Sequence, residues 1–353
     1  MAYLSTLMVE TPGGLWASII NFFESGVASF ALAVILLTIC IKLLMSPLDF
    51  MNKKVARNNA RMQAVLAPQM AKLQKQYGHD RNLLNQKTAE LYKSQGFSMG
   101  GSCVVMLVYL VLTIVIFFTL FSSLMGQSPY RVEQQYLDLR QAYVTTAGTE
   151  DEKKQAVLEA YDARDSKFLW VQNVWFADNP WTSANPTFEQ YLGIVGDKVK
   201  TSHDADAVSL SELKKTNEAE YTTFVANFKT EYEQVMTIVQ DSRPAVNGYL
   251  ITALLAVGTA FLSQYLMQRK NVSKVQKDST VTTPTMNKGM LIILPIVMGV
   301  FTLFYNAVFG LYIVASQLVS MATFPLFDKI LDQMDEKRIK AAEERIKADY
   351  SRK

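Results

Sequence analysis

A lysine inside an apolar segment is the feature of this sequence with the clearest chemical consequence. In "ILLTICIKLLMSPLDF" (Ile35–Phe50), Thr38, Lys42 and Ser46 recur every four residues. This spacing places the three polar side chains on one face of a helix. A cation within hydrocarbon is costly and rare, so two interpretations of Lys42 are open. Its ammonium either reaches the headgroups along its flexible stem, or faces a polar groove, which the neighbouring hydroxyls favour.

Other apolar segments carry polar stripes of the same kind. The spacing of each stripe follows 3.6 residues per turn, and small hydroxyl residues also allow membrane helices to pack closely, which is the alternative explanation for Ser and Thr. Such side chains can bind a polar or acidic ligand by hydrogen bonds and charge, without covalent chemistry. The candidate groove residues are Thr38, Lys42, Ser46, Tyr109, Thr113, Thr259, Ser263, Gln264, Tyr312, Ser316 and Gln317.

The sequence offers little for enzymatic catalysis. It contains no phosphate-binding glycine loop, no H-E-x-x-H and no G-x-S-x-G motif. Its two histidines, His79 and His203, lie in segments that we predict to be on opposite sides of a membrane. We therefore expect no catalytic residue, no metal and no cofactor, and the protein is not expected to be an enzyme.

The apolar segments must position these side chains, and their lengths suit a bilayer. A hydrocarbon core about 30 Å thick needs roughly 20 apolar residues in a helix. The third apolar segment, 248–267, meets this length, and 289–327 is long enough for two helices joined at "YNA" (Tyr305–Ala307). We predict an all-α polytopic membrane protein with five spans. The expected order is an outer or interfacial segment 1–26, first span 27–48, cytoplasmic hairpin 49–100, second span 101–125, extracytoplasmic insertion 126–247, third span 248–267, cytoplasmic loop 268–288, fourth and fifth spans 289–327 and cytoplasmic tail 328–353.

Charge predicts the orientation of these spans. Residues 42–93 contain ten Lys and Arg against three acidic residues, and the tail after residue 327 carries eight basic residues, whereas 127–246 is net acidic. Basic loops are retained in the cytoplasm. The sequence thus predicts an N-terminus outside and a C-terminus in the cytoplasm.

The segments outside the spans are also patterned. In 49–100, apolar residues at helical spacing indicate two helices; we expect Gly78 to end the first in a left-handed conformation and Asp80 to cap the second. A solvated coiled-coil loop is the alternative interpretation. The outer segment is predicted to be mostly helical. Three of its tryptophans suit the membrane–water interface, namely Trp170, Trp175 and Trp181.

Several stretches together resemble the YidC/Oxa/Alb family of membrane protein insertases. They are "LTICIKLLMSPL", the basic hairpin, "YKSQGFSMGGS", "FLWVQNVW" and "ILPIVMGVFTLFYNAVFGLYIVASQLV". The resemblance covers all five predicted spans in the right order and implies a bundle around a hydrophilic groove that is open to the cytoplasm and the lipid. The family carries an arginine on the first span, and Lys42 occupies that position. Lys42 would then attract acidic residues of an incoming chain.

The resemblance implies a membrane protein insertase and chaperone in a bacterial plasma membrane. The implied partners are nascent membrane proteins and the lipid bilayer, with the ribosome and the Sec translocon as further candidates. The family often has Trp after the "LY" of the last span, where this chain has Ile313, and the long outer insertion between the second and third spans departs from the simplest members. Two alternatives stay open: a membrane-protein assembly factor without insertase activity, and a small-solute transporter, which the absence of an internal repeat disfavours.

Overall fold

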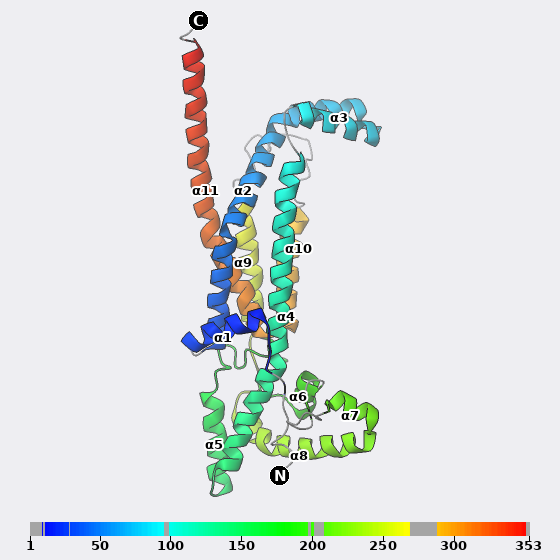
Figure 1. The fold of residues 1–353 in the computed structure, drawn as a ribbon, viewed down its shortest axis with the longest axis vertical. Coiled ribbons are helices and arrows are strands. Elements are labelled where there is room, and N and C mark those ends of the chain that lie inside the picture. The colour runs from blue at the N-terminus through cyan, green and yellow to red at the C-terminus, as the bar shows by residue number, and fades with distance from the viewer. Residues whose placement is uncertain are drawn as a thin grey trace. The chain divides into compact units, whose positions relative to one another are not determined.

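The chain is built from helices in the computed structural model (Figure 1), which describes residues 9, 11–27, 29–94, 99–196, 199–200, 208–268 and 288–350. Its described residues include no strand, only isolated bridges such as Ser183 with Val246. The helices are α1 (Leu15–Val27), α2 (Phe30–Tyr77), α3 (Arg81–Ser94), α4 (Met99–Thr145), α5 (Glu150–Ala163), α6 (Phe188–Val195), α7 (Leu210–Thr216), α8 (Glu218–Ser242), α9 (Ile251–Gln268), α10 (Lys288–Phe304) and α11 (Ala307–Tyr350).

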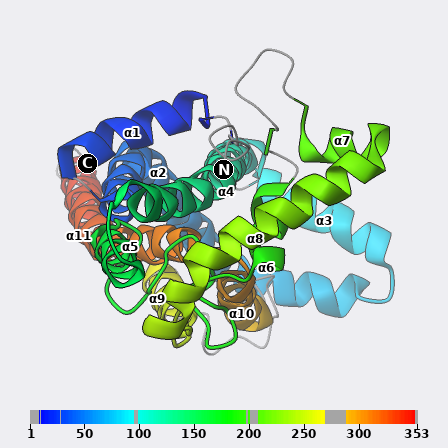
Figure 2. The ribbon, with the colours of Figure 1, turned by 90° about the horizontal axis from the view of Figure 1, so that it is seen from below.

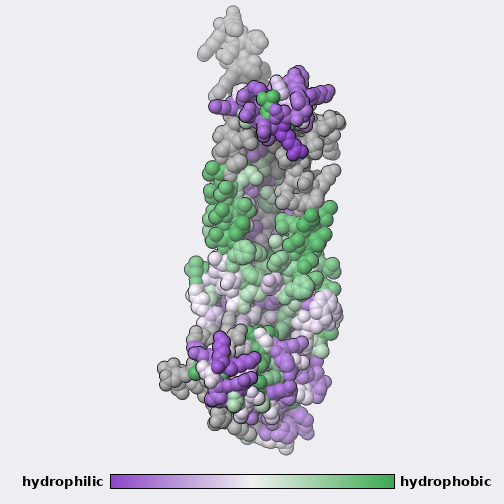
Figure 3. Space-filling view, turned by 90° about the vertical axis from the view of Figure 1, so that its right-hand side faces the viewer, coloured by the Kyte–Doolittle hydropathy of each residue, from purple (hydrophilic) through white to green (hydrophobic). Residues whose placement is uncertain are grey.

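Three described helical segments are long and apolar enough to cross a membrane: Phe30–Met62, Val104–Thr145 and Ala307–Arg338. Two shorter apolar helices, Ile251–Met267 and Ile292–Phe304, coincide with the predicted third and fourth spans. The exposed side chains of the apolar helices are hydrophobic, for example Val104, Leu107 and Leu110 on α4. Figure 3 shows part of the hydrophobic surface in green. The predicted class, an all-α polytopic membrane protein, is confirmed.

The chain divides into two compact units. Unit 1 comprises Met1–Leu37, Phe117–Ala256 and Gly299–Ile313, and unit 2 comprises Thr38–Ile116, Val257–Met298 and Val314–Lys353. Unit 1 therefore contains the predicted outer insertion, and unit 2 contains the predicted hairpin and tail.

An aromatic core holds the helical part of unit 1 together. Helix α8 contacts α5, α6 and α7 (Figure 2), and the rings of Tyr136, Tyr191, Phe228 and Tyr232 pack with centroid separations of 4.7–6.5 Å. Burial raises the pKa of Tyr232 well above its ordinary value, which keeps the phenol neutral; its hydroxyl donates to the carbonyl of Pro186 at 2.9 Å. The two helices that begin near this core start with capping boxes, Thr149–Glu152 on α5 and Thr187–Gln190 on α6.

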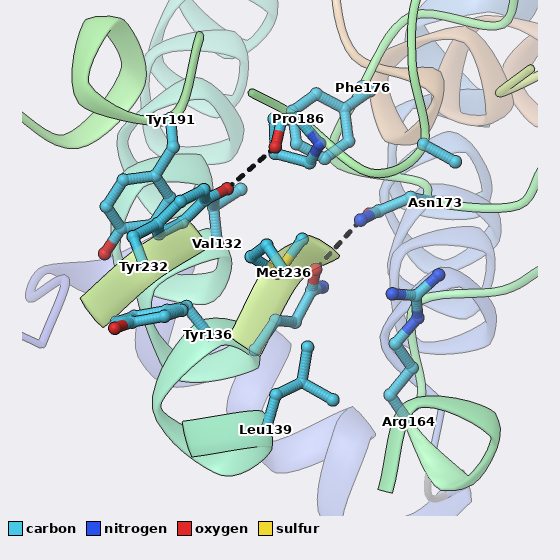
Figure 4. Close-up of a pocket in the computed structure, with 12 residues that line it drawn as sticks. Val132, Tyr136, Leu139, Arg164, Asn173, Phe176, Pro186, Tyr191, Tyr232 and Met236 are labelled. Atoms are coloured by element: carbon cyan, nitrogen blue, oxygen red, sulfur yellow. Dashed lines mark hydrogen bonds between the residues drawn. The ribbon is translucent and has the colours of Figure 1, made fainter. Parts of the chain in front are cut away.

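A small cavity lies beside this core (Figure 4). Its volume is about 20 Å³, and Tyr136, Arg164, Asn173 and Tyr232 are among the residues that line it. A space of this size holds about one water molecule. It is a packing feature and not a ligand pocket.

Trp175 departs from its predicted place at the membrane–water interface. Its side chain is only 5% exposed, because its ring packs on Phe30 at 4.5 Å and the Arg131 guanidinium lies 5.9 Å from its centroid. Arg131 in turn donates hydrogen bonds from Nη1 and Nη2 to the Glu24 carboxylate of α1, at 2.8 and 2.6 Å. Trp175 is thus part of the protein core, and the periodicity of the sequence could not reveal this because its partners are distant in the chain.

The predicted helical hairpin is present in unit 2. Helix α2 ends at Tyr77 and α3 begins at Arg81, and residues from both helices, including Leu73 and Leu91, line one open groove. Asp80 caps α3 as expected, since its Oδ1 accepts from the backbone N–H groups of Asn82 and Leu83.

The left-handed conformation expected at Gly78 is wrong. Gly14 is the glycine with a positive φ among the described residues. A Cβ at Gly78 would instead lie 2.4 Å from the carbonyl oxygen of Gln74. Glycine is required at this turn because the chain passes close to the end of α2, not because of its φ.

Candidate functional site

Lys42 lies in unit 2 with a carboxylate and a phenol as neighbours. Its side chain is half-buried on α2, and it interacts electrostatically with Asp49, which is buried two turns further along the same helix. Tyr109 on α4 lies near the Asp49 carboxylate and interacts with it electrostatically. The structure therefore joins a predicted cation and a predicted hydroxyl through an acidic residue.

Asp49 was missed by the sequence analysis, although a signal for it exists. It follows Lys42 by seven residues, which is two helical turns, and so lies on the same face. A carboxylate beside a cation reduces the cost of holding either charge away from water. We define Lys42, Asp49 and Tyr109 as the cation cluster.

A second polar contact joins α9 to α11. The Ser263 hydroxyl is hydrogen-bonded to Oε1 of Gln317 and also lies 3.1 Å from the Ala260 carbonyl. The neighbouring Gln264 is half-buried, and its Oε1 has no hydrogen-bond partner in the part of the chain that the structure describes. An unsatisfied amide oxygen is costly away from water, so this site suits a polar ligand or a water.

The remaining predicted groove residues of unit 2 differ in their burial and hydrogen bonding. Thr38 is buried, Ser46 and Thr259 are half-buried, and Ser316 is buried. The Thr113 hydroxyl is used within its own helix, since it donates to the Tyr109 carbonyl at 2.8 Å.

Tyr312 belongs to unit 1, unlike the other ten predicted groove residues. It lies in an aromatic group, with centroids 6.3 Å from Phe117 and 6.1 Å from Phe309. Packing between aromatic rings accounts for its position.

A ladder of ion pairs connects α2 to α11 in unit 2. Lys53 pairs with Asp328 at 3.1 Å, Arg57 is bonded to Asp332 and lies 3.4 Å from Asp335, and Arg61 is bonded to Asp335. The basic residues are spaced by four and the acidic ones by four and three, so that each set occupies one helix face. We name these six residues the α2–α11 ladder.

The ladder pairs three of the basic residues in the predicted cytoplasmic hairpin segment with aspartates. Lys53, Arg57 and Arg61 contribute to the basic excess of the hairpin segment, yet each faces an aspartate of α11. These three charges are less available to attract phosphate than the sequence suggested. The more distal basic residues, such as Lys72 and Lys75, are exposed.

The groups at these sites can form hydrogen bonds and electrostatic interactions. Among the described residues, no group of three or more His, Cys, Asp and Glu side chains is placed to hold a metal ion. The cation cluster and the Ser263–Gln317 contact offer charge, hydroxyl and amide groups on helices that are otherwise apolar. They can bind polar groups that enter an apolar environment.

Comparison with known proteins gives one family match and several relatives that are membrane protein insertases. The sequence model of the 60Kd inner membrane protein family matches residues 22–334. A membrane protein insertase YidC from Maridesulfovibrio salexigens is 36% identical over 135 residues, which are 34% of this chain and 24% of that protein. The YidC of Magnetococcus marinus is 35% identical over 113 residues, 32% of this chain and 20% of that protein.

A shorter relative is covered more fully. The membrane protein insertase YidC of Fusobacterium nucleatum subsp. nucleatum is 28% identical over 124 residues, 35% of this chain and 57% of that protein. The alignments thus span between a fifth and three fifths of these relatives. Because the family match covers most of the sequence, from the first predicted span to the start of the tail, the chain belongs to the 60Kd inner membrane protein family, the YidC/Oxa/Alb family that its motifs resemble.

Proposed function

We propose that this protein is a membrane protein insertase and chaperone. It receives nascent hydrophobic segments in a polar groove and releases them into the bilayer without covalent chemistry. The observation that carries this proposal is the cation cluster: a half-buried lysine, a buried aspartate and a tyrosine on two helices of membrane-spanning character. Family membership and the insertases among the relatives support it.

The groove lowers the cost of moving polar residues across the membrane. An Asp at the bilayer centre costs about 2.5–3.5 kcal/mol on insertion scales. Lys42 offsets part of this cost for an acidic residue of the incoming chain. Asp49 attracts the ammonium electrostatically, and an arriving carboxylate competes with Asp49 for it. The two other polar sites, Gln264 and the Ser263–Gln317 contact, form hydrogen bonds with the polar tail of the substrate, directly or through water.

The hydrophobic effect then drives release. The substrate's own apolar segment gains free energy when it leaves the groove for lipid. Helix α10 has 17 residues, about 26 Å at 1.5 Å per residue, and a span shorter than the hydrocarbon core thins the bilayer locally. Thinning shortens the path of the translocated tail.

The proposal includes the topology and partners inferred from charge. Five spans place the N-terminus outside and the hairpin and tail in the cytoplasm, and the outer insertion lies beyond the membrane. The substrates are nascent membrane proteins, and the hairpin and tail are positioned to meet a ribosome or the Sec translocon.

Insertion by the purified protein is the decisive test. Proteoliposomes containing only this protein should insert a single-span substrate with an acidic N-terminal tail, measured by protection of the tail from external protease. Empty liposomes and liposomes with the Lys42→Glu variant are the controls. If wild-type protein binds the substrate but protects no more tail than empty liposomes, it is an assembly factor and not an insertase.

A further inference from the structure

Three exposed apolar side chains of unit 1 lie in segments that are hydrogen-bonded to the start of α9 or to the chain leading into it. Leu169, Trp181 and Tyr249 are 66%, 64% and 64% exposed, respectively. They come from segments far apart in the sequence. A cluster of large apolar side chains turned to solvent indicates a contact with another apolar phase.

A buried aspartate fixes these segments to one another. Asp178 accepts hydrogen bonds from Trp170 Nε1 at 2.9 Å and from the backbone N–H of Tyr249 at 2.8 Å. It also accepts from the backbone N–H of Thr252 at 2.6 Å and from the Thr252 hydroxyl. Since Thr252 is in the first turn of α9, Asp178 ties Tyr249, and the neighbour of Leu169, to the beginning of that helix.

Backbone hydrogen bonds also join the segment that follows Trp181 to the segment that precedes α9. The N–H of Asn247 donates to the Thr182 carbonyl at 3.0 Å, and the N–H of Ala184 donates to the Ala245 carbonyl at 2.7 Å. Trp181 therefore lies beside the chain that leads into α9. Its position relative to α9 is set by these bonds and not by a free loop.

Two strained leucines flank the same network. Leu169 has φ 52° and Leu250 has φ 65°, a left-handed conformation that is unfavourable for a residue with a Cβ. Leu169 is at the tip of a tight turn closed by reciprocal hydrogen bonds between Phe168 and Val171, at 3.0 and 2.9 Å. Strain of this kind is retained where the conformation serves a purpose, and here it presents an apolar side chain outward.

We propose that Leu169, Trp181 and Tyr249 form a lipid-anchoring surface that is embedded in the interfacial layer of the bilayer at the outer end of α9. The surface is continuous along the chain with the first turns of α9, whose Leu254 and Leu255 are exposed and apolar. Helix α9 has 18 residues, about 27 Å, so its first turn lies close to the edge of a hydrocarbon core about 30 Å thick.

The side-chain types fit the interfacial layer. Trp and Tyr are enriched at the membrane–water boundary because their rings are apolar and their N–H and O–H groups remain hydrated. Of the three tryptophans expected at the interface, Trp181 alone is largely exposed, since Trp175 is in the core and Trp170 is half-buried with its N–H bound to Asp178. The anchor sets the depth of the outer insertion. The leaflet rests on the proposed topology, whereas the contact with lipid does not.

Fluorescence quenching in reconstituted vesicles tests this surface. The chain has four tryptophans, so the difference between the emission of the wild type and of Trp181→Phe isolates Trp181. Lipids brominated near the ester carbonyls should quench this difference signal more strongly than lipids brominated near the chain ends, and aqueous iodide should quench it weakly. Trp175→Phe is the matched control, because the buried Trp175 should be insensitive to both lipid quenchers and to iodide.

Two results would overturn the proposal. Strong quenching of Trp181 by iodide without quenching by either brominated lipid would place the surface in water. Protection from all three quenchers would mean that protein covers it, either another part of the assembly or a second copy. The labelling of cysteines described below reports the leaflet separately, so an error in topology is distinguishable from a failure of lipid contact.

Discussion

Lys53 of α2 and Asp328 of α11 form an ion pair in which the lysine is entirely buried: Nζ lies 3.1 Å from Oδ2, and the lysine side chain is 0% exposed. Nζ also donates to the carbonyl of Phe324 at 3.1 Å and lies 5.2 Å from the centroid of its ring. This pair is the first step of the α2–α11 ladder. It connects the root of the hairpin to the helix that continues as the tail.

Removing one partner of this pair should destabilise the protein strongly. Asp328→Asn or Lys53→Met leaves a buried group without its counter-charge, at a cost of about 3–5 kcal/mol, whereas replacing both by apolar residues is often nearly neutral. We expect a lower midpoint of thermal unfolding in detergent for each single variant and recovery in Lys53→Met/Asp328→Leu. The exposed pair Lys87–Glu90 on α3 is the control, since losing a solvent-exposed ion pair should change the unfolding midpoint little. Equal effects at the two pairs would contradict a structural role for the ladder.

The charge of Lys42 should control insertion of substrates with acidic tails. Lys42→Arg keeps the cation and should remain active, while Lys42→Glu places two acids beside each other with Asp49 and should abolish insertion. The double variant Lys42→Gln/Asp49→Asn separates the interpretations, because it removes both charges without leaving either unpaired. We expect it to fold normally but to insert acidic-tailed substrates poorly, as measured by protease protection. Wild-type insertion by this double variant would mean that Lys42 reaches the headgroups and does not act on the substrate.

The proposed orientation can be tested by labelling with an impermeant thiol reagent in intact cells. The structure selects the sites: a Cβ at Gly148 would lie 2.0 Å from the capping Glu152 carboxylate, and one at Gly78 would lie 2.4 Å from the Gln74 carbonyl oxygen. Ala147 and His79 are exposed instead. In a background with Cys40 and Cys103 replaced by alanine, Ala147→Cys should be labelled and His79→Cys protected until the cells are permeabilised. Labelling of His79→Cys in intact cells would reverse the orientation.

The hairpin and the tail should contribute unequally to ribosome binding. Exposed Lys72 and Lys75 lie on the hairpin, while acidic residues nearly balance the basic ones in the tail, and phosphate binding by clustered bases is strongly salt-dependent. Shortening the hairpin should impair insertion severely and weaken salt-sensitive pelleting with ribosomes. Deletion of 339–353 should have a mild effect because it retains Asp328, Asp332 and Asp335.

A deeper truncation is the matched comparison. Deletion after Leu331 removes Asp332 and Asp335, the partners of Arg57 and Arg61, and should lower stability in detergent as well as insertion. If deletion of 339–353 abolished pelleting and insertion while a shortened hairpin had no effect, the assignment of the hairpin would be wrong.

The features that follow from local pattern were predictable from the sequence. The apolar segments give the span helices, Asp80 caps α3, and the break between α2 and α3 occurs at Gly78, as spacing and residue type indicated. Polar residues within apolar helices marked candidate sites because each is unfavourable in hydrocarbon without a partner. Helix formation, capping and the placement of polar residues in an apolar helix depend on residues within one or two helical turns, so they can be read from a single sequence.

The partners of these residues were decided by the tertiary structure. The contact of Asp49 with Tyr109, the pairing of Lys53 with Asp328 and the burial of Trp175 against Phe30 each join residues that are far apart in the chain. Composition showed that Lys53, Arg57 and Arg61 are basic but not that aspartates of α11 face them, because charge along a sequence carries no information on distance in space. The sequence by itself determined which segments must leave water, and only the packing of the helices decided which of their side chains are buried and which of them meet.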